Sequence, residues 1–356
     1  MNSSLRLIQI MFLLIIGSLS NRISKKSKRI TLSSLSSLSS FQSISSSSLS
    51  SSSLSSSSSS SSSSISKEDE EASKIAEFIT SSSNLIVITG AGISTSSGVP
   101  DYRSPNGSYS RGHKPIVHSD FINKESSRKR YWARSMVGWN IFNQAKPNHG
   151  HVGLARIESK NINNKFSIIT QNVDRLHQKA GSRNVIDLHG RNDKLICLSC
   201  NCELSRKIIQ KQIELLNPDI ANELKTNINH SNLRADGDAD LDGIIDYEKF
   251  VVPCCPRCGG GILKPKVVFF GDNVNSQVVQ DIYKSVDESD ALLIVGTSLE
   301  VYSAYRFVDR FAKKSNNICI LNQGKTRSDA NHKLLIRSES NCNTLLKKTA
   351  DLIDSM

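Results

Sequence analysis

The sequence predicts an α/β fold, a Rossmann-like parallel sheet with a small inserted zinc-binding module. Two observations predict it. Short apolar runs are each followed at once by glycine or polar residues, which is typical of buried parallel strands whose carboxyl ends carry ligand-binding loops. Between two of these runs lie two cysteine pairs with the spacing C-x-x-C, which is typical of a zinc site.

The first apolar run, residues 85–89, leads into a glycine-rich segment. The next five residues are Gly90, Ala91, Gly92, Ile93 and Ser94. Glycines let backbone N–H groups approach the phosphates of a dinucleotide closely. The third glycine, Gly98, comes three residues later than in the fingerprint G-x-G-x-x-G, so glycine spacing alone does not establish an NAD site.

Four further apolar runs predict the remaining strands, at residues 166–170, 185–188, 291–295 and 317–321. Polar or small residues follow each run, at the end of a parallel strand where α/β folds place ligand groups. These are Gln171, Asn172 and Asp174; His189; Gly296, Thr297 and Ser298; and Asn322, Gln323 and Gly324. Before the first strand, apolar residues at helical spacing predict a helix beginning near residue 67.

The eight cysteines are unevenly distributed, which favours a metal site over a disulfide framework. Two C-x-x-C pairs supply four thiolates for a tetrahedral zinc ion: Cys197, Cys200, Cys255 and Cys258. With four protein ligands the site is closed, so we expect the metal to be structural. Cys202 and Cys254 lie next to these pairs, and we leave both outside the ligand set.

The segment between the cysteine pairs is longer than in a compact zinc ribbon, so the module carries an insert. Within it, residues 238–246 resemble the first nine positions of an EF-hand loop. The twelfth position is Lys249 instead of the bidentate glutamate that calcium needs. This pattern favours an acidic loop over a tight calcium site.

Residues 1–66 differ from the rest of the chain. Residues 45–64 are serine except for Leu49 and Leu54, which predicts a disordered linker. The apolar run at 8–16 is typical of a secretory signal peptide, whereas the basic cluster at 22–29 and the absence of acidic residues are typical of a mitochondrial presequence. We favour the presequence and a matrix location, because zinc thiolates and NAD suit that compartment; the secretory pathway is the alternative.

The net charge of +12 does not indicate a nucleic-acid-binding protein. Half of it comes from residues 1–66, which hold six basic and no acidic residues. The remainder is modest for a domain of this size. We therefore expect no direct nucleic-acid binding, and no apolar run is long enough to predict a stable membrane span.

Several longer strings resemble the sirtuins, the NAD-dependent protein deacylases. They are GAGIS and SGVPDYR within residues 90–103, TQNVDRLH at 170–177, LHG at 188–190 and KPKVVFFGD at 264–272. The resemblance covers residues 67–356, with the NAD-binding part at 67–190 and 262–356 and the zinc module at 191–261. RYWAR and VYSAYRF resemble class II, in particular its mitochondrial sirtuin-four branch. Lys266 and Asp272 replace an aspartate and a glutamate of the family pattern, which changes the local charge that a substrate peptide would meet.

The resemblance implies a role for each matching residue. His189 is the expected catalytic base, with Asn172 and Asp174 beside it. The loop at 104–120 is expected to close over NAD. The expected NAD contacts are Gly90, Ala91, Gly92, Ile93, Ser94, Asp101, Tyr102, Arg103, Gln171, Asn172, Val173, Asp174, Gly296, Thr297, Ser298, Asn322, Gln323, Gly324 and Cys342.

Two further groups are expected to hold the substrate. The acyl-lysine peptide would pair by β-addition with Val268, Phe269, Phe270 and Gly271. Tyr131 and Arg134, three residues apart on one helix face, match a pair with which class II sirtuins recognise acidic acyl groups. The alternative for this segment is a basic amphipathic helix with Trp132 and Trp139 packed inward.

The implied activity is NAD-dependent removal of an acyl group, acetyl or a bulkier or acidic one, from lysine. The acyl oxygen attacks the nicotinamide ribose and expels nicotinamide, and His189 then deprotonates a ribose hydroxyl. Free lysine and O-acyl-ADP-ribose result, so the expected partners are acyl-lysine proteins. Two alternatives stay open at this point: protein mono-ADP-ribosyltransfer at the same site, or a catalytically silent NAD- or ADP-ribose-binding protein.

Overall fold

The computed structural model describes residues 66–356, except 161, 164, 228–232 and 242. The targeting segment and linker proposed for residues 1–66 therefore lie outside the described residues, apart from Ser66. Ser66 caps the first described helix, where its side chain accepts a hydrogen bond from the N–H of Asp69.

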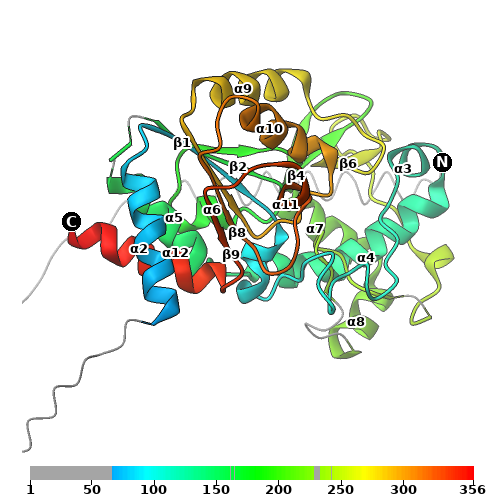
Figure 1. Cartoon of the computed structure of the whole chain (residues 1–356). Helices are drawn as coiled ribbons and strands as arrows, with labels where there is room; N and C mark the ends of the chain where they lie inside the picture. Colours follow the sequence, from blue (N-terminus) through cyan, green and yellow to red (C-terminus); the bar gives the residue numbers. More distant parts are fainter. Residues whose placement is uncertain (1–65, 161, 164, 228–232, 242) are drawn as a thin grey trace, which may run out of the picture. The chain divides into compact units, whose positions relative to one another are not determined.

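A six-stranded sheet forms the larger part of the described chain (Figure 1). Its order is β3-β2-β1-β7-β8-β9, and every neighbouring pair is parallel. The strands are β1 (Asn84–Thr89), β2 (Lys165–Thr170), β3 (Val185–Asp187), β7 (Ala291–Val295), β8 (Ile318–Leu321) and β9 (Ile336–Ser338). Five of the six match the predicted apolar runs. The order reverses at β1, and such a switch point is where ligands bind in α/β sheets.

Helices cover both faces of this sheet, which explains why its strands are continuous apolar runs. One face packs against α2 (Lys67–Thr80), α5 (His149–Lys160) and α12 (Cys342–Ser355). The other packs against α9 (Ser276–Glu288) and α10 (Tyr302–Ala312). The residues of β1 alternate between the two cores: Leu85 and Val87 enter the first, whereas Ile86 and Ile88 enter the second.

A second, three-stranded antiparallel sheet belongs to the module, in the order β5-β4-β6. Its strands are β4 (Gly190–Cys197), β5 (Glu203–Ser205) and β6 (Leu263–Val267). Because β6 begins beyond residue 261, the module sheet takes one strand from the segment that the sequence assigned to the NAD-binding part. Beside it lie α3 (His118–Asn123), α4 (Glu125–Gln144), α7 (Arg206–Leu216) and α8 (Pro218–Asn227).

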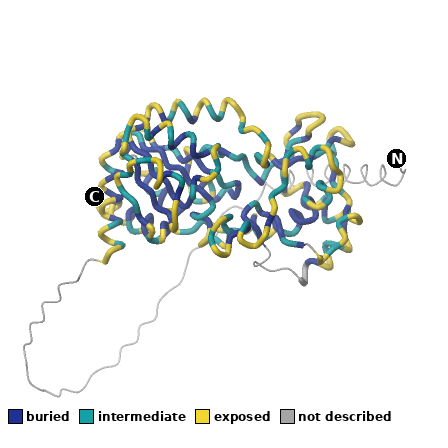
Figure 2. Tube along the Cα trace, turned by 45° about the vertical axis from the view of Figure 1, so that its right-hand side comes forward, coloured by how far each residue is buried: buried dark blue, intermediate teal, exposed yellow. Residues whose placement is uncertain are grey.

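The helix α4 contains the predicted basic segment, with Trp132 and Trp139 buried as the amphipathic interpretation requires. The helices α7 and α8 belong to the insert and were not predicted. Buried residues run through both the sheet and the module (Figure 2). Four short elements complete the part of the fold that the structure describes: η1 (Ala91–Ser97), α6 (Leu176–Ala180), η3 (Tyr247–Lys249) and α11 (Arg327–Asn331). Within the described ranges, no helix combines the length and apolar character needed to span a bilayer.

Candidate active site

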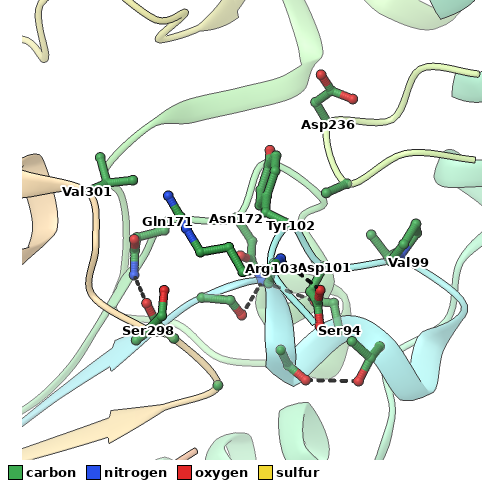
Figure 3. Close-up of a pocket in the computed structure, with 18 of the residues that line it drawn as sticks. Ser94, Val99, Asp101, Tyr102, Arg103, Gln171, Asn172, Asp236, Ser298 and Val301 are labelled. Atoms are coloured by element: carbon green, nitrogen blue, oxygen red, sulfur yellow. Dashed lines mark hydrogen bonds between the residues drawn. The ribbon is translucent and has the colours of Figure 1, made fainter. Parts of the chain in front are cut away.

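A cavity of about 960 Å³ opens at the switch point, between the carboxyl ends of β1, β2, β7 and β8 (Figure 3). The loops that follow all four strands line it, together with parts of the segments 99–109 and 267–274 and the start of α12. Nearly all of the expected NAD contacts lie on this wall. Ile93 is the exception: its side chain is buried in the core beneath, and its carbonyl accepts a hydrogen bond from the Asn148 amide.

The glycine-rich loop after β1 forms a 3₁₀ helix, η1. The N–H of Gly90 donates to the carbonyl of Val295, and the N–H of Gly92 donates to that of Gly296. A Cβ on Gly92 would lie 2.8 Å from the Gly296 oxygen. These two amides are therefore used inside the protein, and the glycines are needed because two backbone loops meet here.

Three predicted residues form a buried network on the floor of the cavity. The hydroxyl of Ser94 donates to Asp174 Oδ2 over 2.7 Å, and the Asn172 amide donates to Ser94 Oγ over 3.1 Å. Asp174 also accepts the N–H of Leu176. Burial raises the pKa of Asp174, although these hydrogen bonds act in the opposite direction. The network fixes the Asn172 side chain, which Figure 3 shows facing the cavity beside Ser94 and Asp101.

His189 is held in one orientation by both ring nitrogens. Nδ1 lies 3.1 Å from the Gln171 carbonyl, which can only accept, so Nδ1 carries the proton. Nε2 lies 2.8 Å from the hydroxyl of Ser303 and accepts from it. Burial lowers the pKa of His189 to about 4, so the imidazole is neutral at pH 7 and Nε2, the nitrogen without a proton, can act as a base when a substrate hydroxyl takes the place of Ser303.

The loop after β7 is tied to the loop after β2. Gln171 Nε2 donates to the hydroxyl of Thr297 over 2.9 Å, and a Cβ on Gly90 would lie 2.6 Å from the Thr297 Cβ. On the far side, the side-chain amide of Asn322 donates to the carbonyls of Gln323 and Gly324. These contacts hold three of the lining loops in place.

The proposed peptide-binding segment, residues 268–271, lies along the cavity rim. The N–H of Val268 donates to the His189 carbonyl, and the carbonyl of Phe270 accepts the N–H of His118. Phe270 is 42% exposed. The segment runs from its contact with His189 to its contact with α3, and its pairing with a peptide stays a prediction.

Tyr131 and Arg134 are outside the lining of the cavity. The ring of Tyr131 packs against Phe121 and Phe269, and Phe269 is a lining residue. Arg134 is buried, pairs with Asp238 at 3.2 Å and donates to the Ala239 carbonyl. The structure thus places Tyr131 one side chain behind the cavity wall and Arg134 against the insert.

The insert supplies lining residues that the sequence did not predict. Ala235 and Asp236 reach the cavity beside Tyr102 (Figure 3). Burial, and next the charge of Asp236, raise the pKa of the Tyr102 hydroxyl. The only sequence signal for this contact was the acidic stretch that resembles an EF-hand.

Two carboxylates of that stretch are paired with arginines. Asp238 pairs with Arg134, and Asp240 pairs with Arg234 at 2.7 Å. His113 lies in the same cluster and contacts both guanidinium groups. Two cations at these carboxylates compete with a metal ion there, and the absence of a tight calcium site stays a prediction. Asp242, part of the same pattern, lies outside the described residues.

The four predicted zinc ligands converge. The sulfur atoms of Cys197 and Cys258 are 3.7 Å apart, and those of Cys200 and Cys255 are 3.8 Å apart. Zinc–sulfur bonds of about 2.3 Å in a tetrahedron require sulfur separations of about 3.8 Å. Any side chain at Gly261 would overlap the sulfur atoms of Cys197 and Cys258. The residues present therefore fit a closed zinc site.

Comparisons with known proteins agree with this arrangement. Residues 90–303 match the model of the Sir2 family. An NAD-dependent protein deacetylase of Bordetella bronchiseptica is 47% identical over 252 residues, which cover 71% of this chain and 88% of that protein. A human protein named NAD-dependent protein lipoamidase sirtuin-4, mitochondrial, is 44% identical over 281 residues, covering 78% of this chain and 86% of that protein.

Solved structures give the same result. A structure described for the mechanism and regulation of Sir2 enzymes superposes with a TM-score of 0.61 at 27% identity, covering 81% of this chain and 99% of the other. A Sir2 complex with a deacetylated peptide and 3′-O-acetyl ADP-ribose gives 0.63 at 25% identity, covering 79% and 98%. The family model spans more than half of the sequence and the relatives match most of it, so the chain belongs to the Sir2 family.

Proposed function

We propose that the chain is an NAD-dependent protein-lysine deacylase, which transfers an acyl group to ADP-ribose and releases nicotinamide. The observation that carries this proposal is the convergence of His189, Asn172 and Asp174 with the glycine loop on one cavity at the switch point. The Bordetella and human relatives are named as a deacetylase and a lipoamidase, both NAD-dependent. Protein acyl-lysine is accordingly the proposed substrate class.

The chain's residues have distinct roles in this reaction. His189 accepts a proton at Nε2 from a ribose hydroxyl, since its Nδ1–H is fixed by the Gln171 carbonyl and its neutral form dominates at pH 7. Asn172 offers a positioned amide, held by Ser94 and the Gly90 carbonyl. Asp174 holds Ser94 in turn. In a partly closed cavity such oriented groups stabilise developing charge more than water does.

His189→Ala tests the proposal. We expect turnover of an acyl-lysine peptide to fall by about 10²–10⁴-fold, the usual contribution of a general base, while NAD still binds in calorimetry. Ser303→Ala is the matched control, because it removes the hydrogen bond to Nε2 but leaves the base in place. Full activity of His189→Ala would refute the assignment. ADP-ribose on a target protein without loss of its acyl group, seen by mass spectrometry, would favour ADP-ribosyltransfer instead.

The preferred acyl group is a finer proposal. We propose that Tyr131 and Arg134 favour a bulky or carboxylate-bearing acyl group over acetyl. The ring of Tyr131 packs against Phe269, which lines the cavity, so Tyr131 would influence the acyl group through the position of Phe269. For Arg134 to hold an acyl carboxylate, it has to exchange its partner Asp238 for the substrate. A panel of acetyl-, succinyl-, glutaryl- and lipoyl-lysine peptides assayed with NAD identifies the preference directly.

We also propose a mitochondrial location, as the composition of residues 1–66 suggests. The human relative is named as a mitochondrial protein, which supports this proposal. Bacterial proteins are similar to the chain too, so the similarity by itself does not specify the compartment. A fusion of residues 1–66 to a fluorescent protein tests it. Co-localisation with a matrix marker is the expected result, and a reticular endoplasmic pattern would indicate the secretory pathway.

A further inference from the structure

A fifth thiol contacts the zinc-binding cluster. Cys202 Sγ lies 3.4 Å from Cys200 Sγ and 3.5 Å from Cys255 Sγ. Cys200 Sγ itself lies 3.8 Å from Cys255 Sγ. The Cys202 sulfur is therefore at least as close to the Cys255 sulfur as the Cys200 sulfur is. Both separations are typical of two thiolates bound to one zinc ion.

The position of Cys202 is fixed by the backbone of the first knuckle. The N–H of Cys197 donates to the Cys202 carbonyl, and the N–H of Asn201 donates to the Cys197 carbonyl. Asn201 adopts a left-handed conformation, φ = 55°, which few non-glycine residues do. This turn brings the chain back so that the Cys202 side chain lies against the cluster. Its closeness to two ligands is thus a property of the fold.

The two neighbouring thiols differ in exposure. Cys200 is exposed, whereas Cys202 is buried, with 6% of its surface accessible. Exposed thiolates are the ones that react with electrophiles and oxidants. Cys200 is thus one of two exposed ligands, together with Cys258, and it is the one that the buried Cys202 contacts. Cys254, which also lies next to the ligand set, bridges to Ile262 through its backbone, and among the described residues its sulfur is not within hydrogen-bond distance of the four ligand sulfurs.

We propose that Cys202 is a reserve zinc ligand, which takes the coordination position of Cys200 when the Cys200 thiol is modified or lost. In the unmodified protein Cys197, Cys200, Cys255 and Cys258 hold the metal. When Cys200 is blocked, Cys202 completes a four-thiolate set with the remaining three, and the module keeps both its metal and its fold. This inference rests on the zinc assignment alone and is independent of the proposed deacylase activity.

Serine variants test the exchange. We expect Cys200→Ser to bind zinc within about tenfold of the unmodified affinity, because Cys202 replaces the lost ligand. Cys197→Ser should weaken zinc binding by about 100-fold or more, because no thiol from outside the ligand set lies within hydrogen-bond distance of Cys197 Sγ among the described residues. The double variant Cys200→Ser/Cys202→Ser should lose the zinc affinity that Cys200→Ser retains. Competition with a chromophoric chelator measures affinity, and the sulfur-to-cobalt charge-transfer band of the Co²⁺ form reports the number of thiolates. Equal losses in Cys200→Ser and Cys197→Ser would overturn the proposal.

A second experiment needs no ligand substitution, so misfolding does not affect it. The zinc-loaded full-length chain is treated with limiting iodoacetamide, whose iodide is displaced by a thiolate sulfur. Native mass spectrometry then counts zinc and label on the same molecules, and peptide mapping locates the label. We expect chains labelled at Cys200 to retain zinc, and the same label in Cys202→Ser to release it; Cys254→Ser is the control. Equal zinc loss in the two backgrounds, or no labelling of Cys200 before zinc leaves, would contradict a reserve role.

Discussion

The sheet and the module are stabilised by different interactions. In the sheet, the whole of β7 is inaccessible to solvent, and both faces of β1 pack against aliphatic side chains. The module also has an apolar core, but charged groups are buried within it. Arg206 is fully buried, with its guanidinium 5.3 Å from the Trp132 ring centroid and 4.9 Å from that of Trp139.

This difference determines how each part responds to perturbation. Apolar burial is spread over many contacts, so losing one of them costs a small share of the total. A metal ligand or a buried ion pair concentrates its contribution in a few atoms, and removing one partner leaves the other uncompensated. We therefore expect the module to fail at specific residues and the sheet to resist local change.

Zinc removal should produce the largest effect, confined to the module. Structural zinc contributes about 10–16 kcal/mol of apparent binding free energy in small zinc domains, far more than a single side chain. After chelation, we expect amide hydrogen exchange to speed up in β4, β5 and β6 while β1, β7 and β8 remain protected. Readdition of zinc should reverse the change. Uniform loss of protection across the sheet and the module would show that they unfold together. The two parts would then not differ in their response to zinc removal.

Arg134→Met should give the next largest effect. The substitution leaves Asp238 buried without its guanidinium partner, and breaking a buried pair costs about 3–5 kcal/mol. Because burial and Asp236 already raise the pKa of Asp238, the variant should regain stability as the pH falls and this carboxyl becomes neutral. Adding Asp238→Asn should restore stability at pH 7. Urea unfolding at pH 7.5 and 5.5 measures both effects.

The same variant tests the acyl preference. With an acidic acyl group as the preferred substrate, Arg134→Met in the Asp238→Asn background should lose more activity on succinyl- or glutaryl-lysine than on acetyl-lysine. The second substitution separates recognition from folding. Equal losses on all peptides would limit Arg134 to a structural role.

The sequence predicted the sheet better than the module. Strands β1, β2, β7 and β8 are apolar runs because both faces are covered, and that pattern is visible without a structure. Strand β9 has three residues, one of them Arg337, which is too short and too polar to be recognised. In the module, α7 buries Ile209 and Ile213, four residues apart, and α8 begins at Pro218; both are local helix signals that the sequence interpretation did not use.

The candidate site shows the same limit. His189, Asn172 and Asp174 follow predicted strands, and their convergence could be inferred from the topology of a parallel sheet. Ser303 and Asp236 could not be inferred, since Ser303 lies in the first turn of α10 and Asp236 in a loop of the insert, and both reach the cavity only through tertiary packing. Cys202 was left out of the ligand set because spacing identifies pairs, whereas its contact depends on the left-handed turn at Asn201.

Mild acid should lower the stability of the sheet more than that of the module. This effect on stability should be smaller than those of zinc removal and of Arg134→Met. Burial lowers the pKa values of His151 and His189 to about 4, below the ordinary 6.5. The unfolded chain therefore takes up these protons first, so the stabilisation is complete above pH 6.5 and is lost as the pH falls toward 4. Each histidine should cost about 1.4 kcal/mol at pH 5.5. The raised pKa of Asp238 acts in the opposite sense in the module.

Hydrogen exchange at pH 7.5 and 5.5, corrected for intrinsic rates, measures the two regions in one sample. We expect the protection of β1 and β7 to fall at the lower pH, and that of the module near Asp238 to change less. His151→Gln should remove the contribution of that histidine, because a glutamine amide does not titrate while it can still hydrogen-bond with Asn148 and Ser94. If the pH dependence of protection in the sheet is unchanged in this variant, His151 is protonated to the same extent in the folded and the unfolded chain. The burial of His151 against the sheet would then not make the sheet more sensitive to mild acid than the module.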